Sequence, residues 1–181
     1  MSPDILLGLA NLNVARKPGR GATVHPDPLA TTDGAADALG LTNMAASDLV
    51  GLRELRQVVV DLVNRVLLGQ RLERQAAHVT ALAQPSWAQA RFELTDGDGL
   101  RQRLDWTDPT LVAGLARQVV LELGAIERAR LRRCGRPECD LLFYDTTRSN
   151  TRRWHAESPC GQRERQRRHR ARGIQRDATD R

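Results

Sequence analysis

The sequence predicts a mainly α-helical chain with one small β-hairpin, an α+β fold. In this fold a helical N-terminal domain precedes a small cysteine-containing module and a basic C-terminal helix. Three observations support this prediction. Apolar residues recur at spacings of three and four over long segments, which is the period of an amphipathic helix. One pair of segments alternates at period two around an Asp-Gly turn. All three cysteines of the chain lie between positions 134 and 160.

The helices of the N-terminal domain, residues 1–130, have recognisable caps and ends. We expect them over residues 27–40, 47–69 and about 71–83. Asp27 can cap the first helix, either Ser47 or Asp48 can cap the second, and each of these two helices ends at a glycine. The second helix has the clearest apolar stripe, formed by Leu52, Leu55, Val59, Leu62 and Val66. Aromatic residues make up only 3% of the chain, so aliphatic side chains must build the core.

A β-hairpin and a long helix complete this domain. Residues 91–95 and 100–106 alternate in the strand period, and the turn sequence 96–99 lies between them. The longest helix is predicted from Pro109 to about Arg133. Its apolar stripe consists of Leu111, Leu115, Val119, Leu123 and Ile126. We expect this helix to run directly into the cysteine-containing module and to connect the two parts stiffly.

The three cysteines and one histidine follow the pattern C-x4-C-x15-H-x4-C, formed by Cys134, Cys139, His155 and Cys160. Two short ligand pairs separated by a loop are typical of a four-ligand zinc site. Three thiolates and an imidazole suit one tetrahedral Zn²⁺ and leave no position for water, which indicates a structural site. His169 is the alternative fourth ligand, but the spacing of His155 to Cys160 mirrors the first pair. Ordinary buried thiols, or one disulfide and a spare cysteine, are the competing interpretations.

A set of motifs surrounds these ligands: Cys134-x4-Cys139, the segment 140–148, Arg152-Arg153-Trp154 and Cys160-Gly161-Gln162-Arg163 with a basic tail. Together they resemble the bacterial CGNR zinc-finger proteins. Gln162 stands where that family usually has Asn, and His155 where it usually has Cys, which is a permitted exchange of zinc ligands. The resemblance implies a CGNR-type zinc finger over 131–173 and an ABATE-type sensor domain over 1–130. It also implies a short strand or turn near residues 9–13 and a proposed role in stress-induced transcriptional regulation.

Basic charge is concentrated in the C-terminal module. The chain has a net charge of +6, and residues 128–172 hold fourteen arginines against five acidic residues, whereas the remainder is slightly acidic. A helix that is polar all round should run from the last cysteine to Gly173, and such a helix suits a nucleic-acid groove. We expect nucleic-acid contacts from Arg148, Arg152, Arg153, Arg163, Arg165, Arg167, Arg168, Arg170 and Arg172. The competing interpretation is a solvated basic tail. Residues 174–181 have no pattern and are expected to be disordered.

These features favour a zinc-dependent transcriptional regulator that binds duplex DNA through the zinc module and the arginine-rich helix. The helical domain would sense a small-molecule effector or form a homodimer. An RNA-binding or ribosome-associated zinc protein is the alternative. An enzyme is disfavoured, because the sequence has no H-E-x-x-H motif, nucleophile elbow or dinucleotide fingerprint. The sequence also predicts no transmembrane helix and no signal peptide, and its metal-type cysteine spacing favours a cytoplasmic location.

Overall fold

The computed structural model describes residues 3–12, 26–42, 44–95 and 99–179. Its helices and helical turns are α1 (Asp4–Asn11), η1 (Pro28–Ala30), α2 (Thr32–Leu39), α3 (Asp48–Leu67), α4 (Glu73–Ala83), α5 (Leu111–Ala125), η2 (Arg128–Arg130), η3 (Glu157–Gly161) and α6 (Gln162–Thr179). Its strands are β1 (Trp87–Thr95), β2 (Gly99–Thr107), β3 (Leu131–Arg133) and β4 (Leu142–Tyr144). These elements confirm the predicted α+β class, with two antiparallel strand pairs among the described residues. In the same ranges, no helix combines the length and apolar character that crossing a bilayer requires.

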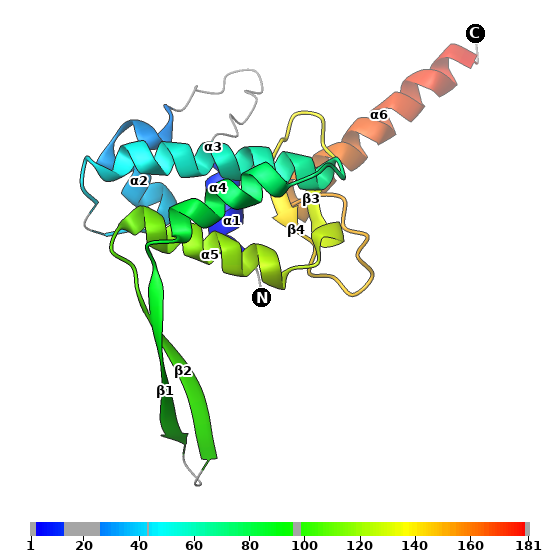
Figure 1. The fold of residues 1–181 in the computed structure, drawn as a ribbon. Helices are drawn as coiled ribbons and strands as arrows, with labels where there is room; N and C mark the ends of the chain where they lie inside the picture. The colour runs from blue at the N-terminus through cyan, green and yellow to red at the C-terminus, as the bar shows by residue number, and fades with distance from the viewer. Residues whose placement is uncertain (1–2, 13–25, 43, 96–98, 180–181) are drawn as a thin grey trace.

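The body of the molecule is formed by α1, α3, α4 and α5, with α1 packed against both α3 and α5 (Figure 1). Its core is aliphatic, as the scarcity of aromatic residues predicts. The side chains at its centre are almost completely buried: Leu6, Leu9, Leu52, Leu55, Val59, Leu62 and Val119. Burial of each such side chain stabilises the fold by about 1.5–3 kcal/mol. The predicted apolar stripe of the second helix is therefore the core-facing side of α3.

The first segment is helical, whereas the resemblance implied a short strand or turn there. It forms α1 and ends at Asn11, and Asn13 lies outside the described residues. The reason is a distant contact. The buried carboxylate of Glu122 accepts hydrogen bonds from the backbone N–H groups of Ile5 (3.2 Å) and Leu6 (2.8 Å). It satisfies donors that the first turn of a helix leaves without partners, and it joins α1 to α5.

The predicted helix over 27–40 is divided into η1 and α2. The Asp27 carboxylate caps η1, and the Thr31 hydroxyl caps α2. As predicted, α2 ends at Gly40 and α3 ends just before Gly69. Both glycines have a left-handed backbone, with φ of +64° and +63°, a conformation that side chains with a Cβ rarely adopt.

The predicted hairpin is confirmed as β1–β2, but the helix that follows it is shorter than predicted. One helix from Pro109 to Arg133 is wrong: α5 ends at Ala125, and Ile126 is extended (φ −94°, ψ 151°) with its side chain buried. Ile126 therefore joins the core from extended backbone and not from a further turn of α5. A turn (η2) and a strand (β3), rather than a continuous helix, therefore lead to Cys134.

The last helix, α6, is longer than predicted. It passes through Gly173 and continues to Thr179, whereas we expected it to end at Gly173 before a disordered tail over 174–181. One glycine inside a helix costs only about 1 kcal/mol, and termination needs the left-handed conformation seen at Gly40. Residues 180–181 lie outside the described residues.

The C-terminal module shares one hydrophobic core with the helical body. Leu131 of β3 and Leu142 of β4 are buried in the same apolar cluster as the residues of α1 and α3. The Asn11 side chain pairs with both backbone groups of Leu142, donating to its carbonyl (3.0 Å) and accepting from its N–H (2.8 Å). Arg133 donates to the Asn64 side chain of α3 (2.7 Å). The edge of the short sheet is therefore closed by the first helix.

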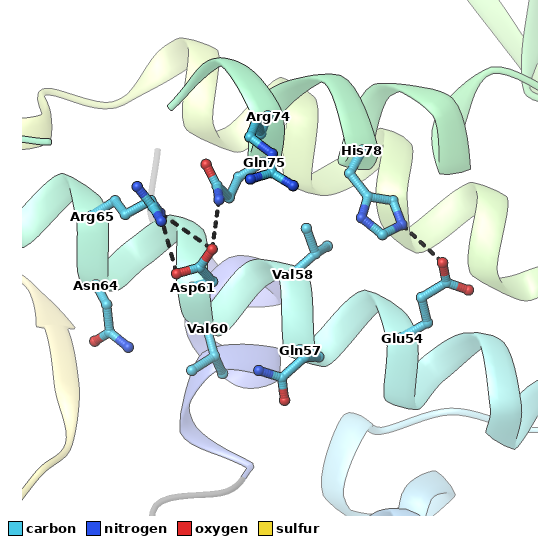
Figure 2. Close-up of a pocket in the computed structure, with 10 residues that line it drawn as sticks. All are labelled: Glu54, Gln57, Val58, Val60, Asp61, Asn64, Arg65, Arg74, Gln75 and His78. Atoms are coloured by element: carbon cyan, nitrogen blue, oxygen red, sulfur yellow. Dashed lines mark hydrogen bonds and ion pairs between the residues drawn. The ribbon is translucent and has the colours of Figure 1, made fainter. Parts of the chain in front are cut away.

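A polar groove of about 630 Å³ lies between α3 and α4 (Figure 2). At one end His78 pairs with Glu54 (2.8 Å). At the other end the Asp61 carboxylate accepts hydrogen bonds from Gln75 (2.6 Å) and from Arg65 (3.2 Å). In the sequence this side of α3 is simply polar, with Gln57, Asp61 and Asn64. The groove arises only because α4 packs beside it.

Candidate metal centre and nucleic-acid interface

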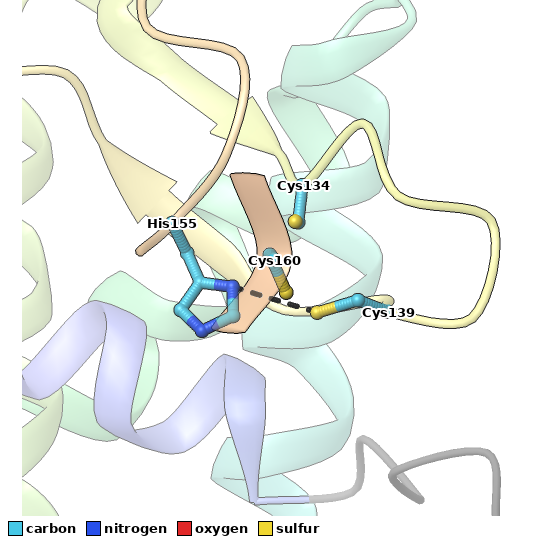
Figure 3. A group of neighbouring side chains, drawn as sticks. All are labelled: Cys134, Cys139, His155 and Cys160. Carbon is cyan, nitrogen blue, oxygen red and sulfur yellow. Dashed lines mark hydrogen bonds between the residues drawn. The ribbon is translucent and has the colours of Figure 1, made fainter. Parts of the chain in front are cut away.

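The structure brings the four predicted metal ligands together at one point (Figure 3). The ligand atoms of Cys134, Cys139, His155 and Cys160 all lie within 4.8 Å of one another. The Cys139 Sγ and His155 Nδ1 atoms are 3.5 Å apart. A tetrahedral Zn²⁺ about 2.3 Å from sulfur and 2.0 Å from nitrogen has sulfur–nitrogen edges of about 3.5 Å. The four residues therefore fit one zinc ion, and the fourth ligand is His155 rather than His169.

Backbone hydrogen bonds shape the loop that carries the first ligand pair. The Cys134 N–H donates to the carbonyl of Leu141 (2.9 Å), and the Cys139 N–H donates to that of Arg136 (2.9 Å). The N–H of Gly135 donates to a carbonyl of the segment that carries His155, at 2.8 Å. A Cβ at position 135 would meet this same oxygen at 3.1 Å, so glycine permits the two ligand segments to approach.

The surroundings of the thiols favour a bound cation. Burial, with the neighbouring sulfurs of Cys134 and Cys160, raises the pKa of the Cys139 thiol to about 12. Zinc binds thiolates, and its positive charge would stabilise three of them here, where Cys134 and Cys160 are buried and Cys139 is half-buried. Arg136 assists: burial opposes its charge, but the Cys160 sulfur and the Glu138 carboxylate together outweigh burial and raise the pKa of the guanidinium. With four protein ligands, the ion has no open position for a substrate or a water molecule.

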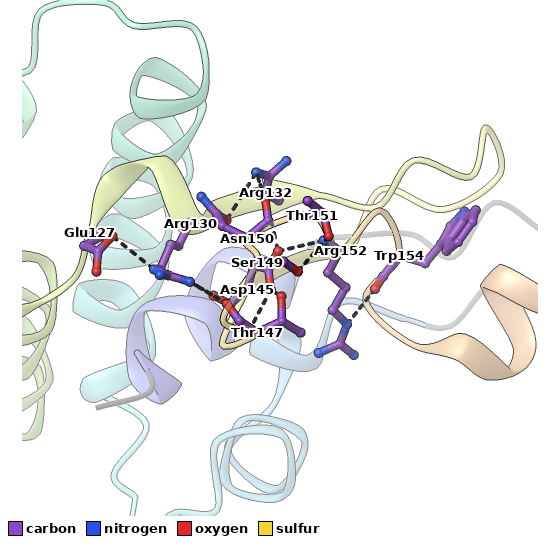
Figure 4. A network of polar contacts seen from close by, with 10 residues as sticks. All are labelled: Glu127, Arg130, Arg132, Asp145, Thr147, Ser149, Asn150, Thr151, Arg152 and Trp154. Atoms are coloured by element: carbon purple, nitrogen blue, oxygen red, sulfur yellow. Dashed lines mark hydrogen bonds and ion pairs between the residues drawn. The ribbon is translucent and has the colours of Figure 1, made fainter.

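A buried carboxylate, Asp145, organises the loop that leads to His155 (Figure 4). It accepts hydrogen bonds from the N–H and hydroxyl of Thr147 (2.9 and 2.5 Å) and from the N–H of Arg152 (2.8 Å). Burial alone would raise its pKa, but these hydrogen bonds outweigh burial and hold the pKa of Asp145 below its ordinary value. Sequence reasoning assigned no role to this residue, because its partners become visible only in the folded loop.

The root of α6 is attached to the metal centre. Cys160 is followed immediately by the first turn of α6, in which Glu164 is buried. Arg167 donates to the Glu164 carboxylate (2.7 Å) and Arg168 does so as well (3.1 Å), which lowers the pKa of Glu164 to about 2. A carboxylate in the first helical turn also suits the helix dipole. The zinc ligand Cys160 thus holds the start of the basic helix at the metal centre, and Glu164 stabilises the first turn of that helix.

The structure distributes the nine predicted nucleic-acid residues unevenly. The exposed ones are Arg148, Arg153, Arg163, Arg165, Arg167, Arg168 and Arg170. Arg152 is half-buried, stacks over the Phe143 ring and donates to the backbone carbonyls of Trp154 and His155, so it has a structural role in the loop. The side chain of Arg172 lies outside the described residues. Whether any of these residues contacts nucleic acid stays a prediction.

The structure also adds two arginines that sequence reasoning left out. Arg132 and Arg133 of β3 line a surface hollow of about 370 Å³ together with Arg152 and Arg153. The signal in the sequence was the Arg-Arg pair immediately before Cys134. It was missed because we placed this pair at the end of a helix. In the observed sheet it lies beside the second arginine pair, which comes from the loop before His155.

The site defines the C-terminal part of the chain as a structural zinc-binding module of the Cys3His type. Comparison with known families agrees with this geometry: residues 130–173 match the CGNR zinc finger. The matched segment begins at the end of η2 and contains all four ligands and the first part of α6. A search of curated proteins gives no match for the chain.

Proposed function

We propose that this protein is a zinc-dependent transcriptional regulator that binds duplex DNA through its zinc module and α6. One observation carries the proposal: a metal ligand, Cys160, is followed directly by an 18-residue helix that projects from the body and bears exposed arginines (Figure 1). Such a helix is about 27 Å long. It lacks an apolar face for a protein core, and its charge suits the phosphates that line a DNA groove.

The arginine-lined hollow supports a second set of backbone contacts. Arg133 and Arg153 are exposed there, and the hollow lies on the same small module as the root of α6. Contacts with phosphate from the module would set the register of the helix on the duplex, while arginines of α6 reach the base edges. The zinc would have a structural role, and we propose no catalytic activity.

The helical body is proposed to be an ABATE-type sensor, in keeping with the resemblance of the sequence. The polar groove between α3 and α4 is its candidate effector site, because its walls offer both acceptors (Glu54, Asp61) and donors (Arg74, Gln75) to a small polar molecule. A change in α3 would reach the module directly, since Asn64 of α3 holds Arg133. In this proposal the protein acts in the cytoplasm and responds to stress.

Fluorescence anisotropy with labelled genomic duplex fragments tests the proposal. The measurements use near-physiological salt and an excess of structured RNA, before and after removal of zinc with a strong chelator. We expect binding that resists RNA and is lost with the metal. The double variant Arg163→Ala, Arg170→Ala should weaken binding and reduce the slope of log K against log salt by about two. The matched control is Arg71→Ala, Arg101→Ala, which removes two exposed arginines outside the C-terminal module and should leave both quantities unchanged.

Two outcomes would contradict DNA-dependent regulation. If structured RNA abolishes duplex binding, the alternative of an RNA-binding or ribosome-associated zinc protein is favoured. If binding survives zinc removal unchanged, the arginines form a general polyanion-binding surface. DNA binding would then not depend on the fold of the zinc module.

A further inference from the structure

The side chains of α6 are sorted by charge around the helix. From position 162 to position 171 the helix carries five arginines, one glutamate and three polar residues without a formal charge, which are Gln162, Gln166 and His169. With about 100° of rotation per residue, these three all lie within about 40° of the line opposite Glu164. All three are exposed. They form one face of α6, which we call the neutral stripe (Gln162, Gln166 and His169).

The root of α6 determines which way the neutral stripe faces. Glu164 is only 4% exposed. Its carboxylate, with a smaller contribution from Glu138 of the first ligand loop, raises the pKa of Arg167. This side of α6 therefore faces the zinc module. Because Cys160 holds the start of the helix at the metal centre, the helix cannot turn freely about its axis, and the neutral stripe points away from the module.

Arginines border the neutral stripe on both sides. Arg163 and Arg170 lie along one edge of the stripe and Arg165 lies along the other. The remaining two arginines of this segment lie close to Glu164 and pair with its carboxylate, at 2.7 and 3.1 Å. The charge that attracts phosphate regardless of sequence is therefore at the borders, and the centre of the exposed face carries none.

We propose that the neutral stripe reads base edges in the major groove of duplex DNA, and that Gln162 and Gln166 select adenine. This inference rests on the proposed function and adds sequence readout to it. A glutamine amide can form two hydrogen bonds with N6 and N7 of adenine, a pattern that no other base presents in that groove. Among the described residues, Gln166 has no side-chain hydrogen bond, and Gln162 accepts only a long one from the Ser158 hydroxyl (3.4 Å). Both amides are therefore available to a base.

The dimensions of the neutral stripe suit this groove. The major groove is about 12 Å wide, and a helix with its side chains is about 10–12 Å in diameter. Gln162 and Gln166 are separated by a rise of about 6 Å, which is close to two base-pair steps of about 3.4 Å each. His169 lies about 4.5 Å farther along and can donate to N7 of a purine. We therefore expect a purine-rich element with two adenines about two base pairs apart.

Duplex RNA does not offer the same site. The major groove of an A-form helix is deep and narrow, so side chains on a helix cannot read the base edges there. The neutral stripe therefore favours DNA over RNA as the duplex that is read by sequence.

Selection from a randomised duplex library, with the zinc-loaded full chain, tests this inference. Wild type should enrich sites that contain the two adenines. In a competition assay, exchange of either adenine pair for a guanine pair should weaken binding about tenfold. Gln166→Ala should reduce this discrimination to less than about twofold at one adenine and keep it at the other. Gln166→Glu should change the preferred base there from adenine to cytosine, because a carboxylate accepts from cytosine N4.

The matched control is Arg165→Ala, which removes an exposed side chain one residue away, at the border of the neutral stripe. It should weaken binding to all duplexes by a similar factor and leave the base preference unchanged. Zinc content and circular dichroism of all three variants should equal those of wild type, because each substituted side chain is exposed.

Three outcomes would overturn the inference. Duplex binding in the anisotropy measurement without enrichment of any base would refute base readout and leave the proposed function standing. Enrichment that Gln166→Ala leaves unchanged would show that another surface reads the bases. Absence of all duplex binding would refute the proposed function and this inference together.

Discussion

The two strand pairs of this protein differ in how they are attached to the rest of the molecule. The long pair, β1–β2, is paired along its whole length, and yet it stands away from the body (Figure 1) with the apolar side chains of Leu104 and Trp106 exposed. The short pair, β3–β4, has three residues in each strand, and Leu131 and Leu142 are buried within it. The comparison shows that anchoring to a core, rather than strand length, decides which sheet is a fixed part of the fold.

Different forces hold the two pairs. The short pair is closed by the zinc ligands beyond one end and by the Asn11 amide along its edge. The long pair has cross-strand ion pairs whose side chains are all about half exposed, and such pairs stabilise a protein by only about 0–1 kcal/mol. Zinc removal or a substitution at one strand pair should therefore change that pair and leave the other pair unchanged.

Removal of zinc should have the largest effect. A structural zinc site stabilises its module by about 10 kcal/mol or more, so chelation, or Cys139→Ser, should unfold β3–β4 and the loop around Asp145. Hydrogen exchange followed by mass spectrometry should show loss of protection over residues 131–160 and no change in β1–β2. Zinc content measured on the same samples is the control. Protection that persists in metal-free protein would show that the shared core alone holds the short pair.

Asn11→Ala should have an intermediate effect on the short pair. It leaves the N–H and carbonyl of Leu142 without partners in a buried place, at a cost of about 2 kcal/mol. Urea unfolding of the zinc-loaded protein measures this loss. The matched control on the long pair is Gln89→Ala, which should change the stability by less than about 0.5 kcal/mol. Equal effects of the two variants would mean that Asn11 does not anchor β4.

Arg117→Ala should have the smallest effect on stability and act at the base of the long pair. Its hydrogen bond to Asp108 holds the pKa of that carboxyl below its ordinary value of 3.8. Loss of the guanidinium should raise the pKa of Asp108 toward 3.8 and lower the stability by less than about 1 kcal/mol. The stabilisation from this ion pair is present above pH 3.8 and is lost as the pH falls below it.

Carboxyl NMR titration measures the pKa of Asp108 in both proteins. Arg103→Ala, which removes an arginine from the middle of β2, should leave the pKa of Asp108 unchanged. An unaltered pKa in Arg117→Ala would show that Asp108 does not depend on this partner in solution.

The features that were predicted best from the sequence are those that depend on residues close together in the chain. The four zinc ligands follow from their spacing, and the hairpin follows from alternation around an Asp-Gly turn. The ends of α2 and α3 follow from glycines that adopt the left-handed conformation. Each of these signals lies within one short segment, or in two segments joined by a recognisable loop.

Features that depend on distant partners were predicted wrongly or not at all. The start of α1 depends on Glu122, which lies more than a hundred residues away in the chain. The helix predicted through Arg133 is interrupted because burial of Ile126 and the pairing of β3 with β4 stabilise extended backbone there. Asp145 received no role, because its hydrogen-bond partners converge only when the loop closes.

By itself, the sequence determined the class of the fold, the zinc site with its four ligands, and the concentration of arginine in the last third of the chain. Only the tertiary structure decided that the module shares its core with the helices, that α3 and α4 enclose a polar groove, and that the β1–β2 hairpin leaves Leu104 and Trp106 exposed. The physical reason is the range of the interactions. Turn chemistry, caps and ligand spacing are local, whereas burial depends on which distant surfaces meet.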